Sequence, residues 1–304
     1  MKNQFTSRLM MVRPAAFGYN EQTALTNAFQ HKSIEEVNVQ QKALREFDVY
    51  VEKLSSRGLE VIVFEDTAIP PKPDALFPNN WISMHHDGTL CLYPMCTENR
   101  RIERSEAIIA GIKSNNNVSR CIDISSYESE RCYLEGTGSI IFDHEHNLAY
   151  AGISERSNKT LFEYHCASLG YTPVSFSTMG DGGIPIYHTN VMLTIGSGFA
   201  VIGDAVIADE DKQKVVSLLN DTGHEIIHIT SEQIRAFAGN MLQVGDEENH
   251  YLVMSQTAFL SLIPEQVKAI ERHTEILPVT IDTIEQIGGG SARCMLAEIF
   301  LQKT

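Results

Sequence analysis

A cysteine follows a run of three glycines in residues 288–294, Gly-Gly-Gly-Ser-Ala-Arg-Cys. A thiolate is a good nucleophile at neutral pH when a cation or backbone donors lower the pKa of its thiol. Glycines let other groups approach the backbone closely, so Cys294 is a candidate nucleophile. A cysteine that opens an apolar strand is nevertheless more often a buried structural thiol. The run also lacks the GxGxxG spacing of a dinucleotide-binding loop.

Two further residues could carry a proton for such a nucleophile and orient the proton carrier. His188 ends residues 180–188 and stands at the entry of an apolar hairpin, and Glu135 lies in a glycine-flanked turn before another hairpin. A histidine shuttles protons near neutral pH. Taken singly, a histidine that merely caps a strand explains His188 about equally well, and a carboxylate in a turn such as Glu135 is usually just solvated. Their equivalent places, ahead of the inner strands of different repeat units, favour a shared site.

The elements that must position these residues form a repeat. An apolar run, a short turn of Gly, Asp, His or Asn and a second apolar run predict a hairpin. The pattern occurs four times at intervals of about 50 to 60 residues: 81–84 with 90–93, 139–142 with 148–150, 191–195 with 199–202, and 240–244 with 251–254. A helix-like stretch and a short β-rich segment follow each hairpin: 99–113 and 118–124, 159–169 and 172–176, 209–220 and 225–229, and 264–273 and 275–279.

Both ends of the chain supply a fifth unit. Residues 8–14 and 293–301 are its expected inner strands, residues 34–57 its helix and residues 60–64 its outer strand. One such unit cannot bury its apolar face alone, so neighbouring units must pack in an array or a closed ring. We therefore expect an α/β fold, a five-bladed propeller with pseudo-fivefold hairpin-helix-strand units. The chain shows no Pro/Gly/Ser-rich linker, so residues 1–304 are assigned to a single domain.

Composition narrows the classes of function. The formal net charge is −15, with 24 Lys and Arg against 39 Asp and Glu, so nucleic acid and anionic membranes are not expected as partners. The N-terminus lacks a signal-peptide apolar core, and the chain has no membrane-length apolar stretch. Six cysteines without a CxxC pair indicate reduced thiols. We expect a cytoplasmic protein with a small-molecule partner, and the sequence leaves open whether it forms a homo-oligomer.

Together these stretches resemble the guanidine-modifying (pentein) superfamily, which includes arginine deiminase, dimethylarginine dimethylaminohydrolase, agmatine deiminase, succinylarginine dihydrolase and the amidinotransferases. Residues 152–158, Gly-Ile-Ser-Glu-Arg-Ser-Asn, are similar to the family's Gly-Leu-Ser-x-Arg-Thr-Asn. Residues 99–103 resemble its paired-arginine segment. The resemblance covers nearly the whole chain and implies a single pentein catalytic domain.

The resemblance implies roles for individual residues. Cys294 attacks the guanidino or ureido carbon, His188 protonates the leaving nitrogen and later activates water, and Glu135 orients His188. Arg156 corresponds to the arginine that grips the substrate's α-carboxylate, and Arg100 and Arg101 are alternatives for that task. No metal or organic cofactor is expected.

Two positions depart from the family pattern. Asn79 and Asn80 stand in Phe-Pro-Asn-Asn-Trp, and Asn190 follows His188 by two residues, where guanidinium-binding relatives usually have carboxylates. An amide offers both a donor and an acceptor, which complement a neutral ureido group. This favours citrulline, hydrolysed to ornithine, ammonia and carbon dioxide, and the motif resembles that of bacterial citrulline-utilisation hydrolases. Succinylarginine dihydrolase-like enzymes weaken this argument, and Asp74 could supply a missing carboxylate.

Other interpretations stay open. An arginine deiminase, a dimethylarginine-type hydrolase or an amidinotransferase would use the same three residues, and a ribosome-subunit anti-association factor with this propeller would bind without catalysis. The clusters His85-His86-Asp87 and Asp143-His144-Glu145-His146 fall in expected hairpin turns. Polar turn composition explains these clusters without a metal.

Overall fold

The computed structural model describes residues 2–32, 38–180 and 183–304, and these form five three-stranded sheets. In every sheet the central strand pairs antiparallel with one neighbour and parallel with a third strand that follows a helical crossover. The antiparallel neighbour is a hairpin partner in four sheets, whereas β15 reaches β1 from the other end of the chain. In spatial order the sheets are β15 (Ala297–Glu298), β1 (Arg8–Arg13) and β2 (Glu60–Glu65); β3 (Ile82–Met84), β4 (Thr89–Leu92) and β5 (Arg120–Asp123); β6 (Ile141–Asp143), β7 (Leu148–Ile153) and β8 (Thr172–Ser177); β9 (Leu193–Gly196), β10 (Phe199–Ile202) and β11 (Glu225–His228); and β12 (Leu242–Gly245), β13 (His250–Ser255) and β14 (Glu275–Val279).

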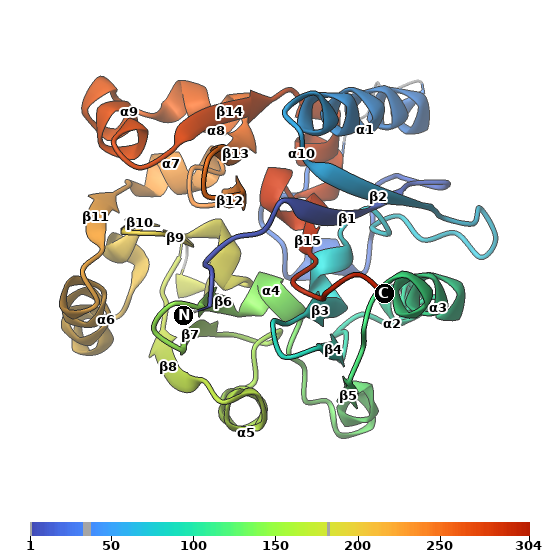
Figure 1. Ribbon diagram of the computed structural model, residues 1–304, viewed down its shortest axis with the longest axis horizontal. Coiled ribbons are helices and arrows are strands. Elements are labelled where there is room, and N and C mark those ends of the chain that lie inside the picture. The colour runs from blue at the N-terminus through green and yellow to red at the C-terminus, as the bar shows by residue number, and fades with distance from the viewer. Residues whose placement is uncertain (1, 33–37, 181–182) are drawn as a thin grey trace.

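The longer helices lie on the outside of these sheets (Figure 1). They are α1 (Val39–Ser56), α3 (Glu106–Asn115), α5 (Lys159–Leu169), α6 (Asp209–Asp221) and α9 (Pro264–Glu271), with the short helices α2 (Glu98–Arg101), α4 (Gly136–Ser139), α7 (Ser231–Arg235), α8 (Gln256–Ser261) and α10 (Asp282–Gly288) between them. Helix α5 illustrates how the local sequence sets the two ends and the buried face of a helix. The Asn158 side chain accepts a hydrogen bond from the Leu161 amide, Gly170 ends the helix in the left-handed conformation, and the face with Leu161, His165 and Leu169 is buried.

The expected α/β class and the order of hairpin, helix and outer strand are confirmed. Four details of the prediction are wrong. Residues 293–295 belong to a 3-10 helix, η7 (Ala292–Met295), rather than to a strand, and residues 99–113 divide into α2 and α3. Two expected hairpin starts lie in helical turns instead, since Ser139 ends α4 and Val191 ends η5 (Thr189–Val191). The start of the expected helix 34–57 lies outside the described residues, and α1 is described from Val39.

Short helical turns precede four of the inner strands and bring the site together. They are η2 (Pro78–Asn80) before β3, α4 before β6, η5 (Thr189–Val191) before β9, and η7 before β15. The turn α4 contacts both η2 and η5, and η2 contacts η7, so segments more than 200 residues apart in the chain meet. Figure 1 shows α4 in the middle of the molecule, with the sheets around it.

None of the described helices has the length and apolar character needed to cross a membrane.

Candidate active site

Glu135 and His188 form a buried hydrogen-bonded pair. Glu135 immediately precedes α4 and His188 immediately precedes η5, and their Oε2 and Nε2 atoms are 2.7 Å apart. The second carboxylate oxygen of Glu135 accepts a hydrogen bond from the Cys96 amide at 2.9 Å. Gly138 makes the approach possible, because a Cβ at this position would lie 2.9 Å from Nδ1 of His188 and 2.4 Å from Nδ2 of Asn80.

The charges around this pair fix its protonation. Burial alone would raise the pKa of Glu135, but the Arg156 charge and the hydrogen bond with His188 outweigh it and lower that pKa to about 2. Burial lowers the pKa of His188 to about 4, against the opposing pull of Glu135. At neutral pH an ionised Glu135 therefore accepts the Nε2 proton of a neutral His188. The lone pair of the imidazole is left on Nδ1.

Cys294 lies in η7, buried, with two side-chain amides directed at its sulfur. Nδ2 of Asn190 is 3.4 Å from Sγ, and Nδ2 of Asn240 is 3.3 Å from it. Nδ2 of Asn240 also donates to the backbone carbonyl of Asn190 at 3.0 Å, and Oδ1 of Asn240 accepts from the backbone amide of Arg293 at 3.0 Å. The Cys294 sulfur therefore has two side-chain N–H groups within hydrogen-bonding distance.

Cys294 and His188 line one small cavity, whose volume is about 20 Å³. That volume holds about one water molecule. The remaining lining residues are Thr23, Asn27, Asp74, Phe77, Asn80, Arg100, Arg156, Tyr187, Gly288, Gly289 and Gly290. The structure is thus a closed form in which residues 23–27 cover the cysteine and the histidine.

Two of the three expected arginines reach this cavity. Arg156 donates to the Thr26 hydroxyl at 2.6 Å and to the Thr23 carbonyl at 3.0 Å, and it lies 3.6 Å from Glu135. Arg100 forms a bidentate ion pair with Glu103, at 2.9 Å to each carboxylate oxygen.

The other arginine and two expected asparagines, Asn79 and Asn190, are not among the residues that line the cavity. Arg101 is directed to the backbone carbonyls of Met95 and Cys96, so it is not brought to the site. The Asn79 side chain accepts from Asn80 at 3.1 Å and is not among the cavity-lining groups.

Asn80 and Asp74 both line the cavity, with different freedom to bind. Oδ1 of Asn80 accepts from Arg100 at 2.8 Å, so its acceptor is already occupied. Oδ2 of Asp74 accepts from Asn20 at 2.7 Å and from Thr23 at 3.2 Å, whereas its Oδ1 is buried without a hydrogen-bond partner. Burial raises the pKa of Asp74 despite the nearby Arg100 charge. Oδ1 of Asn190 is also buried without a partner.

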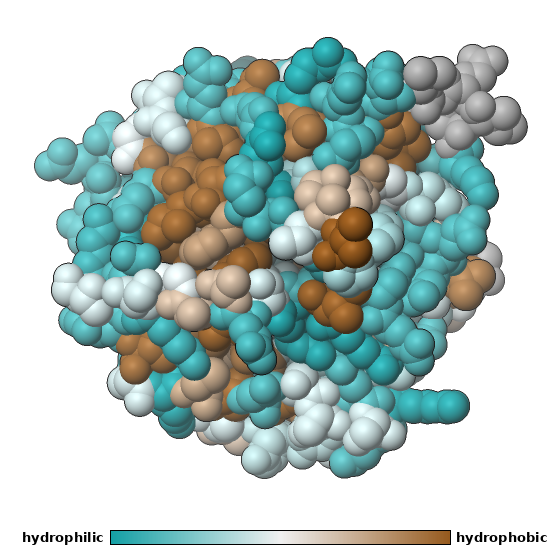
Figure 2. All heavy atoms as spheres, turned by 90° about the vertical axis from the view of Figure 1, so that its right-hand side faces the viewer, coloured by the Kyte–Doolittle hydropathy of each residue, from teal (hydrophilic) through white to brown (hydrophobic). Residues whose placement is uncertain are grey.

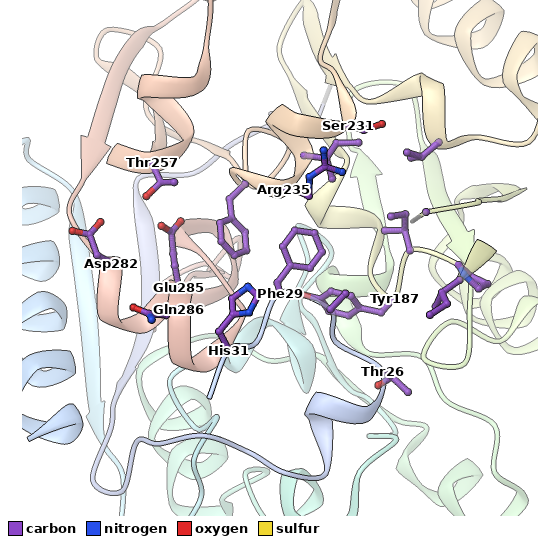
Figure 3. A pocket seen from close by; sticks show the side chains of 18 residues that line it. Thr26, Phe29, His31, Tyr187, Ser231, Arg235, Thr257, Asp282, Glu285 and Gln286 are labelled. Atoms are coloured by element: carbon purple, nitrogen blue, oxygen red, sulfur yellow. The ribbon is translucent and has the colours of Figure 1, made fainter. Parts of the chain in front are cut away.

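A larger pocket of about 410 Å³ adjoins the closed cavity. Tyr187 lines both, and its hydroxyl donates to the Gly289 carbonyl at 2.9 Å. Figure 3 shows Phe29 beside Tyr187 in this pocket, with Asp282 and Glu285 at the opposite side and Thr26 at its edge. The volume of this outer pocket falls in the range of small-molecule sites. Tyr187 separates the outer pocket from the closed cavity that contains the Cys294 thiol.

Sequence reasoning missed Asn240 and the covering segment 20–30. Asn240 precedes β12 in the same repeat position that Asn80 and Asn190 occupy before β3 and β9, and this equivalence could have identified it. The covering segment carries no motif. Its contacts with Asp74, Arg156 and Gly289 are formed across 50 to 260 residues of chain, where sequence spacing has no information.

A family model described as N,N dimethylarginine dimethylhydrolase, eukaryotic, matches residues 13–301. A search of curated protein sequences finds no match.

Solved structures have the same fold. ArgZ, an arginine dihydrolase from the ornithine-ammonia cycle in cyanobacteria, is 15% identical with a TM-score of 0.77 over 96% of this chain and 40% of its own, so the present chain spans about two fifths of that protein. The N-terminal domain of ArgZ bound to product is 15% identical, with a TM-score of 0.75 over 96% of this chain and 97% of that domain. A dimethylarginine dimethylaminohydrolase adduct with S-methyl-L-thiocitrulline is 15% identical, with a TM-score of 0.67 over 97% and 99% of the two chains.

The family match extends over almost all of the chain and includes the segments that carry Glu135, His188 and Cys294. A binding protein without catalytic residues is therefore set aside. The chain belongs to the N,N dimethylarginine dimethylhydrolase family of the guanidine-modifying pentein superfamily, enzymes that hydrolyse the C–N bonds of amidines.

Proposed function

We propose that this protein is a cysteine hydrolase that converts citrulline to ornithine, ammonia and carbon dioxide, with Cys294, His188 and Glu135 as its catalytic residues. The observation that carries the proposal is a neutral, carboxylate-oriented imidazole that shares a closed cavity with a thiol held by two amides. This combination is the nucleophile, base and orienting group of covalent catalysis.

The chemistry runs in two halves. His188 accepts the Cys294 proton, the thiolate attacks the ureido carbon, and the protonated His188 gives its proton to the terminal nitrogen, which leaves as ammonia. The remaining S-carbamoyl thioester is attacked by a water that His188 deprotonates. The thiol is restored, and the N-carboxylated ornithine loses carbon dioxide. Glu135 stays ionised throughout and stabilises the imidazolium that forms in each half.

The charges of the cavity support a neutral substrate. Glu135 is paired with His188 and Arg156, and Glu103 with Arg100, so these carboxylates are already neutralised. A buried guanidinium would need a further carboxylate, since an uncompensated buried charge is costly. Asn190 lies beside the Cys294 sulfur, and its side-chain carbonyl oxygen has no hydrogen-bond partner. We propose that this oxygen meets an NH₂ group of the substrate once the covering segment opens.

Arginine is the second candidate substrate, and a specific observation favours it. Oδ1 of Asp74 is buried without a partner in the cavity wall and could pair with a guanidinium. The fold neighbour ArgZ is named an arginine dihydrolase. With arginine the same residues would release ammonia and form either citrulline or, after a second round, ornithine.

Either substrate requires the covering segment to open, because the closed cavity holds about one water. We propose that the α-carboxylate of the substrate takes the place of Thr23 and Thr26 at Arg156, and that entry runs along the outer pocket past Tyr187. Arg100 is held by Glu103 and donates to the Asn80 side chain. We therefore propose that Arg100 orients the Asn80 amide and does not bind the α-carboxylate of the substrate.

We also propose that the fold is a five-bladed propeller and that the protein is cytoplasmic. The sheets contact one another through β15 and β3, β6 and β9, and β9 and β12, which supports a five-bladed propeller formed by a single domain, residues 1–304. The six cysteines are free thiols, as expected of a cytoplasmic protein.

The test is a substrate panel. Purified protein is incubated with citrulline, arginine, dimethylarginine and agmatine, and ammonia, ornithine and citrulline are quantified against the Cys294→Ala variant. We expect ornithine and ammonia from citrulline at a higher kcat/KM than from arginine. A preference for arginine would replace citrulline by the second candidate, and no turnover of any of the four would refute the proposed function.

A further inference from the structure

A second cluster of ligating side chains lies at the other end of β6 from Glu135. Asp143 is the last residue of β6, His146 lies in the turn to β7, and His224 immediately precedes β11 in the neighbouring sheet. One nitrogen or carboxylate oxygen from each residue lies within 4.8 Å of the others. Asp143 and His224 are buried, and the His146 side chain is 36% exposed. The proposed reaction uses none of the three residues.

The hydrogen bonds of His224 leave one ring nitrogen without a proton. Its Nδ1 is 2.9 Å from the Thr222 hydroxyl, and that hydroxyl already donates to the carbonyls of Leu218 and Leu219. The hydroxyl oxygen must therefore accept, which places the ring proton on Nδ1. In a neutral ring with its proton on Nδ1, Nε2 carries a lone pair.

That lone pair faces a carboxylate. Nε2 of His224 is 3.9 Å from Oδ2 of Asp143, beyond hydrogen-bond length, so the two atoms face each other without a hydrogen bond. Two acceptors that face each other in a buried place repel unless a cation lies between them. Nδ1 of His146 approaches the same carboxylate at 2.9 and 3.0 Å. The His146 ring is exposed enough to move its proton to Nε2 and offer Nδ1 as a third ligand.

These distances suit a small transition metal. Zinc binds nitrogen and oxygen ligands at about 2.0–2.2 Å in a tetrahedron, so its ligand atoms lie about 3.3 Å apart. Oδ2 of Asp143 lies 3.0 Å from Nδ1 of His146 and 3.9 Å from Nε2 of His224, on either side of that value. Two imidazoles and one carboxylate select Zn²⁺ and its neighbours, whereas Ca²⁺ and Mg²⁺ prefer oxygen ligands alone. The Thr222 hydroxyl orients His224 as the outer partners of zinc-bound histidines do.

We propose that Asp143, His146 and His224 bind a Zn²⁺ ion that joins the β6–β7 hairpin to the sheet containing β11. Water completes the coordination on the exposed side of His146. This differs from the sequence-based expectation, which explained Asp143 and His146 by turn composition and could not place His224, about 80 residues further along the chain, beside them.

The experiment uses the full chain with Cys294 replaced by alanine, so that the buried thiol does not compete for metal. Bound zinc after dialysis and the thermal midpoint with Zn²⁺, Ca²⁺ or Mg²⁺ are measured for this protein, for added His146→Ala and for added His228→Ala. His228 is a matched control because it forms an Asp–His pair, at 3.1 Å from Asp204, with a more exposed side chain.

We expect the parent and the His228→Ala protein to bind one more zinc per chain than the His146→Ala protein. Zn²⁺ should also raise the thermal midpoint of the first two proteins by about 2–4 °C more than that of the His146→Ala protein. Ca²⁺ and Mg²⁺ should produce no such rise. Equal zinc content and equal midpoint shifts in all three proteins would overturn the proposal, as would an equal rise with Ca²⁺. None of these readouts depends on turnover, so failure here leaves the proposed hydrolase unaffected.

Discussion

Neutral amides surround the sulfur of Cys294, where cysteine enzymes often place a cation. Asn190 and Asn240 reach it from the entries of two different inner strands, and neither is a surface residue. In the proposed reaction these N–H groups hold the sulfur while His188 accepts its proton.

Asn240→Asp replaces one of these donors by a carboxylate of the same shape. We expect alkylation of Cys294 at pH 7 to slow about ten- to a hundredfold, because a charged hydrogen bond of about 1.5–3 kcal/mol is lost and a negative charge opposes the thiolate. The measurement is the iodoacetamide rate at Cys294 followed by peptide mass spectrometry. Asn117→Asp, at an exposed amide, is the control. An unchanged rate would remove Asn240 from thiol activation.

Asn190→Asp tests the choice between a neutral and a charged substrate. An ionised Asp cannot donate to the sulfur or to a ureido oxygen, but it can pair with a guanidinium. We expect kcat/KM for citrulline to fall at least tenfold, and the ratio of arginine to citrulline kcat/KM to rise. Equal losses for both substrates would show that Asn190 holds the thiol without reading the charge of the substrate.

Short helical turns, rather than strands, deliver the site residues, and their prediction from sequence failed for a physical reason. The hairpins were predictable because turn residues separate apolar runs at a regular interval. The turns η2, η5 and η7 span only three or four residues, too few to stabilise themselves, and they form because each packs against another unit. Cys294, His188 and Glu135 could still be identified from their equivalent places and family motifs. Asn240 belongs to no motif, and only its equivalent place before β12 could have identified it.

The loop between α10 and η7 depends on Gly289. This glycine has φ +63°, and a Cβ there would lie 2.4 Å from Gln30 and 2.7 Å from Asn27. Gly289→Ala should displace the covering segment and lower kcat/KM at least tenfold, while the backbone strain costs about 1–3 kcal/mol. Gly58→Ala is the control, because Gly58 has φ +81° and nothing within 4 Å of its Cβ position. We expect it to lose stability and keep its kcat/KM. Similar kcat/KM losses in both variants would contradict the role of the close contact.

At the scale of the whole molecule, buried polar groups rather than surface features distinguish this protein. Figure 2 shows apolar patches separated by hydrophilic residues on one face, an ordinary protein surface. The interior holds His85, His165 and His188, whose pKa values burial lowers to about 3, 4 and 4. Each stays neutral in the folded chain and takes up a proton on unfolding in mild acid.

His165 provides the most direct test of how a buried neutral histidine changes the free energy of unfolding with pH. Its pKa of about 4 in the fold lies below the value of about 6.5 in an unfolded chain, so between these values only the unfolded chain binds the proton and stability falls as pH falls. We expect His165→Gln to flatten the pH dependence of the unfolding free energy by up to about 1.4 kcal/mol per pH unit in this window. Urea unfolding at pH 6.5, 5.5 and 4.5 measures it, with exposed His228→Gln as the control. Parallel curves for wild type and His165→Gln would show that His165 is protonated in the fold.

The central claim is that Cys294 forms a covalent intermediate with the carbon of a ureido or guanidino group, and acid-quenched mass spectrometry during turnover tests it directly. Wild-type protein mixed with excess citrulline or arginine should show an added mass on the peptide that contains Cys294. Cys294→Ala should show neither the adduct nor ammonia release, and its folding should be preserved, since the loss of one buried thiol costs about 1–2 kcal/mol. Ammonia release by Cys294→Ala at the wild-type rate, or an adduct on another residue, would contradict the account.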